Sequence, residues 1–574
     1  MVSSISTARL GQCERRGLLL FDELRAIQAT YGYLPSDQLH ELAGKLKMPV
    51  SEIHAVASFY PHFYLKPPPK VDVRVCADMS CHLLGAARLR RSLEESFTSR
   101  SPAEISIRDV SCLGRCDTAP ALSINDHIYS GVTPPLAVEM IEGALNGKLP
   151  RHPARDQSHP PLETDPYPGP STYQAVRRFL ENRDHNAVLS ALKTSTLRGL
   201  GGAGFPTGTK WEIVRNAPGA QKYVVCNADE SEPGTIKDRF IMEKIPHLVI
   251  EGMIVAGLVA GATKGFLYIR HEYEEPREVL QEEIERCYRE HILGRGVLGS
   301  ELDFDLEIFV SPGGYICGEE SALLEAMEGK RAEPRNKPPF PGTNGLWNAP
   351  TVINNVETFA FAAAILLKGA EWYKKRGVGG VSGLKFVGIS GDVVYPGVYE
   401  VAMGVSYRDL IFKYAGGIRD GRHLLGFAPS GPSSGYLPAS LVDLPLDFKA
   451  LADAGSMVGS GAIVVCAEGR CMLDMALNST RFFRNESCGK CVPCRMGSQK
   501  LVDLLTRWTE GESGKNDLTV IDELFKAMRL ASICGLGQII HAPMASILKH
   551  FPTVIDDHLK TRRCPGGVCF PGQG

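Results

Sequence analysis

Four cysteines toward the C-terminal end have the spacing of a metal-cluster site. Cys488, Cys491 and Cys494 follow one another with two residues between each, and Cys534 comes after 39 intervening residues. Three thiolates on a tight turn plus one distant thiolate can close around a four-iron cluster. Four thiolates also suit zinc, but a structural zinc usually takes its cysteines as separated pairs. The spacing therefore favours [4Fe–4S] over zinc.

A second cysteine group lies in the first quarter of the chain. Cys76-x4-Cys81 is followed, after 30 residues, by Cys112-x3-Cys116, and each pair comes just after a predicted strand. Loops at strand ends can hold a two-iron cluster. Zinc is the alternative here, because paired cysteines also build zinc ribbons.

The segment RGLGGAGFPTGTKW combines glycines with a lysine. Gly199, Gly201 and Gly204 formally match G-x-G-x-x-G. A Rossmann fingerprint must follow a strand, whereas the preceding HNAVLSALKTS has a helical pattern, so the match is weak. The glycines can still bring backbone amides close to a phosphate, with Lys210 supplying positive charge. A plain glycine-rich turn is the alternative.

Polar side chains crowd the end of a predicted strand in CNADESEPGTIKDR: Asn227, Asp229, Glu230 and Glu232. Neighbouring carboxylates repel one another unless they face solvent or donors such as ribose hydroxyls and flavin ring N–H groups. A solvated acidic loop is the alternative. Glu319 and Glu320, which open a predicted helix, repeat this pattern of polar groups beside glycines and aromatics.

Length and composition indicate a multidomain globular protein. At 574 residues, and about 100–200 residues per domain, we expect three or four domains. The net charge of −2 excludes the basic face that nucleic-acid binding needs. The most apolar stretch, residues 248–269, contains Glu251 and Lys264 and predicts a buried helix leading into a strand, not a membrane span. The N-terminus lacks the apolar core of a secretory signal, so we expect a cytoplasmic protein whose sixteen cysteines serve metal or redox chemistry.

The elements that must position these residues follow from hydrophobic periodicity. Helical patterns occur at 18–60, 83–97 and 187–193 and after Pro276, and strand patterns occur in VDVRVCAD, ISIRDVS, ALSIND, KYVVCN and GFLYIR. A proline-rich, charged stretch is the clearest linker. The predicted divisions are a helical lead-in at 1–70, a small α/β domain at 71–148, a linker at 149–171, a large α/β domain at 172–383, a small α+β module at 384–467 and a helical domain with a cysteine-bearing tail at 468–574.

The motifs and their order along the chain resemble those of the NADH-binding flavoprotein subunit of respiratory complex I and its soluble relatives, over residues 172–560. The region of Cys76 to Cys116 resembles the two-iron, thioredoxin-like subunit that accompanies it, here fused into one chain. The resemblance implies a multidomain α/β protein: a thioredoxin-like [2Fe–2S] domain, a Rossmann-like FMN/NADH domain, a ubiquitin-like (SLBB-type) α+β module and a C-terminal helical bundle with [4Fe–4S].

The resemblance also assigns site residues. The positions that would hold FMN are Gly199, Gly201, Lys210, Asn227, Asp229, Gly318, Asn354 and Asn355. Those that would contact NAD(H) are Phe205, Glu230, Glu232, Glu320, Lys337 and Phe340. The implied chemistry is hydride transfer between nicotinamide and flavin N5, with no catalytic protein nucleophile, followed by single-electron transfer through the clusters. The acidic character near Glu230 and Glu232 favours NAD over NADP, because it would repel a 2′-phosphate.

The fusion resembles the diaphorase β-subunit of NAD-dependent molybdenum or tungsten formate dehydrogenases, as does the segment SSGYLPASLVDLPLDF. The alternatives are the flavin subunit of a soluble NAD-reducing or bifurcating hydrogenase, and an NADH-dehydrogenase module of complex I. The partner would be a catalytic subunit carrying formate or hydrogen chemistry and further iron–sulfur clusters, in a hetero-oligomer without nucleic acid or direct membrane insertion.

The closing RRCPGGVCFPGQG adds Cys564 and Cys569. They form either a partial zinc or iron site, shared with a ligand such as His558, or two unpaired surface thiols. The remaining cysteines are interpreted as ordinary structural residues: Cys13, Cys226, Cys287, Cys317, Cys466 and Cys471.

Overall fold

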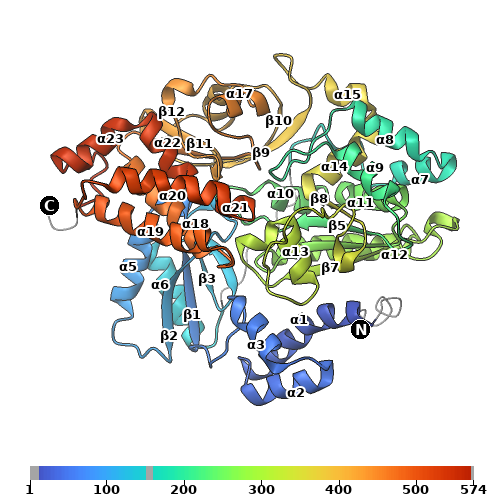
Figure 1. Cartoon of the computed structure of the whole chain (residues 1–574), viewed down its shortest axis with the longest axis horizontal. Coiled ribbons are helices and arrows are strands. Elements are labelled where there is room, and N and C mark those ends of the chain that lie inside the picture. The colour runs from blue at the N-terminus through green and yellow to red at the C-terminus, as the bar shows by residue number, and fades with distance from the viewer. Residues whose placement is uncertain (1–11, 150–158, 571–574) are drawn as a thin grey trace. The chain divides into compact units, whose positions relative to one another are not determined.

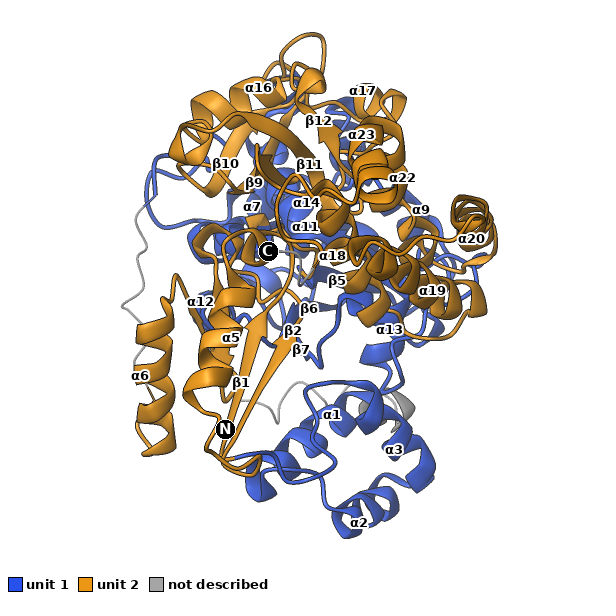
Figure 2. Ribbon diagram, turned by 90° about the vertical axis from the view of Figure 1, so that its left-hand side faces the viewer, with its two compact units in different colours: residues 1–69, 156–230, 238–374 blue, residues 70–155, 231–237, 375–574 orange. Residues whose placement is uncertain are grey.

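The computed structural model describes residues 12–149 and 159–570, with side chains from residue 17 onward (Figure 1). Residues 150–158 of the predicted linker and the side chain of Cys13 lie outside the described part. The chain divides into two compact units (Figure 2). Unit 1 comprises Met1–Pro69, Asp156–Glu230 and Asp238–Lys374, and unit 2 comprises Lys70–Arg155, Ser231–Lys237 and Lys375–Gly574. Among the described helices, none combines the length and apolar character needed to cross a membrane.

Unit 1 begins with three helices: α1 (Gln12–Tyr31), α2 (Ser36–Leu46) and α3 (Val50–Phe59). The ring of Phe21 in α1 packs at 5.3 Å from Tyr60 and at 6.1 Å from Phe309, and the Tyr60 hydroxyl donates to the Lys330 carbonyl at 2.6 Å. Gly17 lies so close to the backbone of Glu328 that a Cβ would be 2.5 Å from its carbonyl carbon. The helical lead-in is therefore packed onto the large α/β domain of the same unit.

The large domain contains a parallel sheet of four strands in the order β7-β6-β5-β8. They are β5 (Tyr223–Ala228), β6 (Lys264–Arg270), β7 (Asp305–Ser311) and β8 (Thr351–Asn355). Every residue of β6 is buried, as expected of a parallel strand covered on both faces. The helices of this domain are α7 (Gln174–Asn182), α8 (His185–Thr194), α9 (Thr207–Asn216), α10 (Lys237–Lys244), α11 (Pro246–Ala260), α12 (Glu274–Arg289), α13 (Glu320–Met327), α14 (Val356–Lys368) and α15 (Ala370–Lys374).

The strand order contains a reversal. The chain proceeds from β5 outward through β6 to β7, then returns to place β8 on the other side of β5. In open α/β sheets, ligands bind beyond the carboxyl ends of the strands where the order reverses. We therefore expect a cofactor at the carboxyl ends of β5 and β8.

Unit 2 opens with a small α/β domain whose sheet has the order β2-β1-β3-β4, with β1 and β2 parallel and the other pairs antiparallel. Its elements are β1 (Val71–Cys76), α4 (Met79–Leu83), α5 (Ala86–Ser96), β2 (Ile105–Val110), β3 (Ala121–Ile124), β4 (His127–Ser130) and α6 (Pro134–Leu145). This topology is the predicted thioredoxin-like arrangement, and Val71, Val73 and Val75 of β1 lie in its core.

The second sheet of unit 2 is mixed, in the order β10-β9-β13-β11-β12. Its elements are β9 (Leu384–Gly391), β10 (Gly397–Ala402), α16 (Tyr407–Asp409), β11 (Leu424–Pro432), β12 (Leu437–Pro438), α17 (Phe448–Asp453) and β13 (Ala462–Ala467). The first and last strands are parallel neighbours at the centre, as in the predicted ubiquitin-like module.

The C-terminal part of unit 2 is helical, as predicted. Its helices are α18 (Met472–Asn485), α19 (Val492–Thr509), α20 (Asp517–Ala531), α21 (Gly535–Ile539), α22 (Ala542–His550) and α23 (Pro552–Asp556). Helix α18 packs against both α19 and α22, so it forms the centre of this bundle.

Candidate functional site

The predicted flavin residues of the strands meet at the reversal of the sheet. Asn227 of β5 pairs in register with Asn355 of β8, and Cys226 with Asn354. The Asn227 amide donates to the Gly318 carbonyl at 2.8 Å, and Trp211 Nε1 donates to Asn354 Oδ1 at 2.9 Å. Unit 1 thus orients these amides at the carboxyl edge of the sheet.

The glycine-rich loop runs between two helices, α8 and α9, and not from a strand into a helix. This confirms the prediction that its glycines are not a Rossmann fingerprint. Arg198 and Pro206 form an isolated antiparallel bridge, and the Gly199 amide donates to the Phe205 carbonyl at 2.8 Å. A Cβ on Gly201 would lie 2.9 Å from the Cβ of Asn355. The loop therefore comes close to the end of β8 only because residue 201 is glycine.

Charged groups also lie at this edge of the sheet. Lys210 Nζ donates to the Ile353 carbonyl at 3.0 Å, and burial lowers the pKa of this lysine. Asp229 Oδ2 accepts a hydrogen bond from the Ser311 hydroxyl at 3.1 Å, at the end of β7. A Cβ on Gly318 would lie 3.2 Å from the Asp229 carbonyl oxygen.

These residues fit FMN by their chemistry. Two glycines leave room where side chains would otherwise lie, a half-buried lysine supplies a cation for a phosphate, and amides and a carboxylate offer partners for ribityl and flavin ring groups. The predicted FMN residues all belong to unit 1.

The predicted NAD(H) residues divide into three sets. Phe205 and Phe340 are 44% and 58% exposed, which is unusual for phenylalanine and leaves both rings available for stacking. Lys337 Nζ contacts Glu319 Oε1 at 2.8 Å and Glu320 Oε1 at 2.7 Å. Glu319 also caps α13 by accepting from the amides of Ser321 and Ala322.

Glu230 and Glu232 have different surroundings. The buried Glu230 carboxylate accepts hydrogen bonds from the amides of Asp238 and Arg239, at 2.7 and 3.0 Å, and from the Tyr273 hydroxyl at 2.8 Å. Glu232 belongs to unit 2, where Oε1 accepts from the Ser433 amide at 2.9 Å. The other predicted dinucleotide residues belong to unit 1, and the role of both carboxylates toward NAD(H) stays a prediction.

The four N-terminal cysteines converge within unit 2. All four thiols are buried, and Cys112 Sγ lies 3.5 Å from Cys116 Sγ. Hydrogen bonding with Cys112 and Cys81, together with burial, raises the pKa of Cys76. Backbone amides of Gly114 and Gly234 donate to Cys112 Sγ and Cys116 Sγ at 3.4 and 3.3 Å. Buried thiols with amide donors suit a two-iron cluster, whose sulfurs accept such bonds.

The second predicted cluster site lies at the start of two helices of unit 2. Cys491 precedes α19, which contains Cys494, and Cys534 precedes α21. Burial, with the charges of Cys491, Cys534 and Cys488 as further causes, raises the pKa of Cys494 to about 12. A Cβ on Gly537 would lie 3.1 Å from the Cys494 Cβ. Helix N-termini favour thiolates, which is the form that binds iron.

Sequence reasoning missed the surroundings of Cys471. From the sequence, Cys471 is interpreted as an ordinary structural cysteine. In the structure, its Sγ lies 3.5 Å from His558 Nε2 and 3.8 Å from Cys569 Sγ. Its separation of 87 residues from His558 left no local spacing signal.

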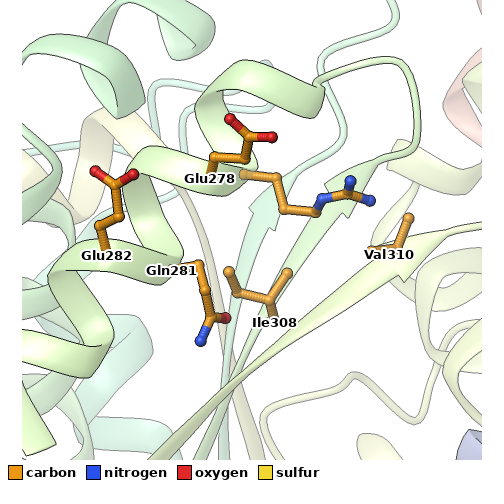
Figure 3. A pocket seen from close by; sticks show the side chains of 6 residues that line it. Glu278, Gln281, Glu282, Ile308 and Val310 are labelled. Carbon is orange, nitrogen blue, oxygen red and sulfur yellow. The ribbon is translucent and has the colours of Figure 1, made fainter. Parts of the chain in front are cut away.

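A pocket elsewhere in unit 1 lies between α12 and β7 (Figure 3). It is lined by Arg277, Glu278, Gln281, Glu282, Ile308 and Val310. None of the predicted cofactor residues lines it, and it carries no part of the flavin site.

Three protein families match consecutive parts of the chain. The thioredoxin-like [2Fe-2S] ferredoxin family matches residues 9–144, the Nuo51 FMN-binding domain matches residues 192–364, and the NADH-ubiquinone oxidoreductase-F iron-sulfur binding region matches residues 474–558. FMN, a [2Fe–2S] cluster and a [4Fe–4S] cluster are therefore the cofactors of these domains, as predicted.

Individual relatives cover most of the chain. An NADH-quinone oxidoreductase subunit of Rhizobium meliloti (strain 1021) is 43% identical over 393 residues, which are 68% of this chain and 93% of that protein. The alpha subunit of the NAD-reducing hydrogenase HoxS of Cupriavidus necator is 33% identical over 95% of this chain and 93% of its own. A crystal structure of an NAD+-reducing [NiFe]-hydrogenase in the H2-reduced state matches with a TM-score of 0.84 and 34% identity, over 94% of this chain and 93% of that one.

Proposed function

Because this chain belongs to the family of NADH-oxidising flavoprotein subunits that carry FMN and iron–sulfur clusters, we propose that it exchanges electrons between NAD(H) and a catalytic partner subunit. The finer proposal is that the partner oxidises formate at molybdenum or tungsten, so that the chain is the diaphorase β-subunit of an NAD-dependent formate dehydrogenase.

The observation that carries the proposal is the combination of the predicted flavin residues at the reversal of a parallel sheet with two separate sets of four cysteines on one chain. FMN, when bound, supplies hydride exchange with nicotinamide and single-electron exchange with iron–sulfur clusters. The role of the protein is then to bind, orient and shield.

The residues of unit 1 can perform these tasks. The glycine-rich loop and Lys210 provide amides and charge for the phosphate, and the amides of Asn227, Asn354 and Asn355 fix the orientation of the ring system. The exposed rings of Phe205 and Phe340 offer stacking faces for the dinucleotide. Such alignment lowers the barrier of hydride transfer without a protein nucleophile.

The formate assignment rests on the fusion of the two-iron domain to the flavin domain and on the segment SSGYLPASLVDLPLDF. A second candidate, the flavin subunit of an NAD-reducing hydrogenase, is favoured by the matches to such hydrogenases over nearly the whole chain. In either assembly, the chemistry of formate or hydrogen belongs to another chain.

Elemental analysis of the native, co-purified complex separates the two candidates. We expect molybdenum or tungsten, with FMN and iron in the same sample. Nickel would overturn the formate proposal in favour of a nickel–iron hydrogenase. The absence of all three metals would overturn both in favour of a bifurcating iron hydrogenase or an NADH-dehydrogenase module.

Two activity measurements test the diaphorase itself. The FMN-replete chain should reduce ferricyanide with NADH, and no turnover would refute the proposal. We also propose that the enzyme prefers NAD over NADP and acts in the cytoplasm within a hetero-oligomer. A larger kcat/KM for NADP(H) would overturn the cofactor preference.

A further inference from the structure

Four potential metal ligands from separate segments of unit 2 meet at the C-terminal tail. They are Cys471, His558, Cys564 and Cys569, and their sulfur and nitrogen atoms all lie within 4.8 Å of one another. Cys471 is the residue just before α18, and the other three lie in the last part of the described chain. None of them belongs to the two cysteine sets assigned to iron–sulfur clusters.

The distances match one tetrahedral metal ion. Zinc–sulfur bonds of about 2.3 Å and zinc–nitrogen bonds of about 2.0–2.1 Å give sulfur–sulfur separations of about 3.8 Å and sulfur–nitrogen separations of about 3.6 Å in a tetrahedron. Cys471 Sγ lies 3.8 Å from Cys569 Sγ and 3.5 Å from His558 Nε2. A cubane would hold its ligands farther apart, because several iron and sulfide atoms lie between them.

The histidine is oriented for coordination. His558 Nδ1 lies 2.7 Å from the Val554 carbonyl oxygen, so Nδ1 carries the proton and donates it there. Its Nε2 lone pair therefore faces the three sulfurs, which is the arrangement found for most metal-binding histidines. The ring is fully buried, and Phe570 covers it at a centroid distance of 5.4 Å.

The turn between the last two cysteines is also shaped for this site. The Cys564 carbonyl accepts from the Gly567 amide at 3.1 Å, and Gly567 has a φ of +63°, which favours glycine. A Cβ on Gly566 would lie 2.7 Å from the Cys471 backbone nitrogen. The amides of Val568 and Cys569 donate to the Cys564 sulfur. Amide donors stabilise the negative charge of a metal-bound thiolate.

We propose that Cys471, His558, Cys564 and Cys569 bind one structural Zn²⁺ ion. Four protein ligands fill the tetrahedron and leave no position for water, so the site is structural and has no catalytic role. On binding, three thiols lose their protons to solvent and the metal is neither oxidised nor reduced.

The ion would fasten the tail to the start of α18. Because α18 packs against α19, which contains Cys494, this link would stabilise the helical bundle that holds the four-iron cluster.

The test is metal analysis of the full-length protein in its native complex, purified without added zinc or chelator. We expect about one zinc per FMN, and a zinc K-edge spectrum with three sulfur and one nitrogen ligands at the bond lengths given above. In Cys569→Ser and His558→Ala, zinc per FMN should fall at least about tenfold. The matched control Cys287→Ser removes a buried cysteine of unit 1 that lies outside every cysteine cluster, and it should retain its zinc.

Three results would overturn the inference. They are an absence of zinc in the wild-type complex, a zinc ion with oxygen ligands or iron bound in place of zinc, and a full zinc content in both variants. Because the wild-type spectrum needs no substitution, the inference stays testable even if a variant fails to fold.

Discussion

Replacing Gly201 with alanine should weaken FMN binding through a defined contact. The new Cβ would lie 2.9 Å from Asn355 Cβ and 3.2 Å from its Cγ, closer than carbon atoms approach without displacement. Asn355 cannot move freely, because its Nδ2 donates to Asp238 at 2.5 Å and its Oδ1 caps α14 through the Glu357 amide at 3.0 Å. Losing a cap costs about 1 kcal/mol, and a hydrogen bond to a charged group contributes about 1.5–3 kcal/mol.

The FMN-free chain can relieve this clash by moving the loop, whereas the FMN-bound chain must hold the loop against Asn355. A cost of about 1.4 kcal/mol or more that falls on the bound state corresponds to a rise of about tenfold or more in the FMN dissociation constant. Flavin fluorescence quenching during titration of the deflavinated protein measures it. In Gly199→Ala, the new Cβ finds only the Phe205 backbone at 3.6 Å, so any loss of FMN affinity there reports a direct contact with the cofactor. Gly169→Ala, with open space around the new Cβ, is the control. If Gly201→Ala binds FMN as tightly as Gly169→Ala does, the loop does not act as we describe.

Three further predictions concern the clusters, the dinucleotide and pH. Cys534→Ala should lose about four iron atoms per FMN while NADH still bleaches the flavin, and electron delivery to the partner should stop; unchanged delivery would remove this cluster from the electron path. Lys337→Ala leaves Glu319 and Glu320 without their shared cation, so the KM for NADH should rise about tenfold with a smaller effect on kcat. Lys337→Arg should restore part of the affinity for NADH, and steady-state kinetics that show no change in KM would contradict this role. Burial raises the pKa of Glu251 from 4.5 to about 7, so the folded chain retains a proton that the unfolded chain releases above pH 4.5. The free energy of unfolding therefore falls by on the order of 3 kcal/mol as the pH rises to about 7. Glu251→Gln should therefore show a shallower decline of Tm between about pH 5 and pH 8, and an equal decline in both proteins would refute this cause.

Much of the fold is predictable because local patterns and tertiary packing agree. The strand patterns of VDVRVCAD, KYVVCN and GFLYIR are confirmed as β1, β5 and β6, and the apolar stretch at 248–269 is confirmed as a buried helix followed by a strand. Helix α12 begins at Glu274, two residues before the predicted start at Pro276, because helical geometry includes residues that carry no apolar signal. The strand orders could not be derived, since they depend on packing between segments far apart in the chain.

The candidate site was predictable where the ligands are close in sequence. The spacing identifies the cysteine pairs that begin at Cys76 and Cys112 and the triple that begins at Cys488. Because each cluster needs four thiolates, the two pairs combine into one set and the triple needs one more cysteine, Cys534. Cys471 gave no such signal, because its nearest ligand in sequence is 87 residues away and it stands alone before a helix. A long-range site whose ligands come one by one is visible only after folding.

The acidic segment after β5 contributes residues to both units. Glu230 accepts hydrogen bonds from the first amides of α10, whereas four residues later Gly234 belongs to unit 2 and donates its amide to Cys116 Sγ at 3.3 Å. Gly234 has a φ of +95°, and a Cβ there would lie 2.6 Å from Val464, so only glycine allows this approach. An amide aimed at a cluster sulfur stabilises the more negative, reduced cluster and so raises its reduction potential. Gly234, which the sequence places in a nucleotide-facing loop, is therefore a donor to the predicted two-iron site in the folded chain. We expect a substitution at Gly234 to change the reduction potential of that predicted cluster before it changes NADH binding.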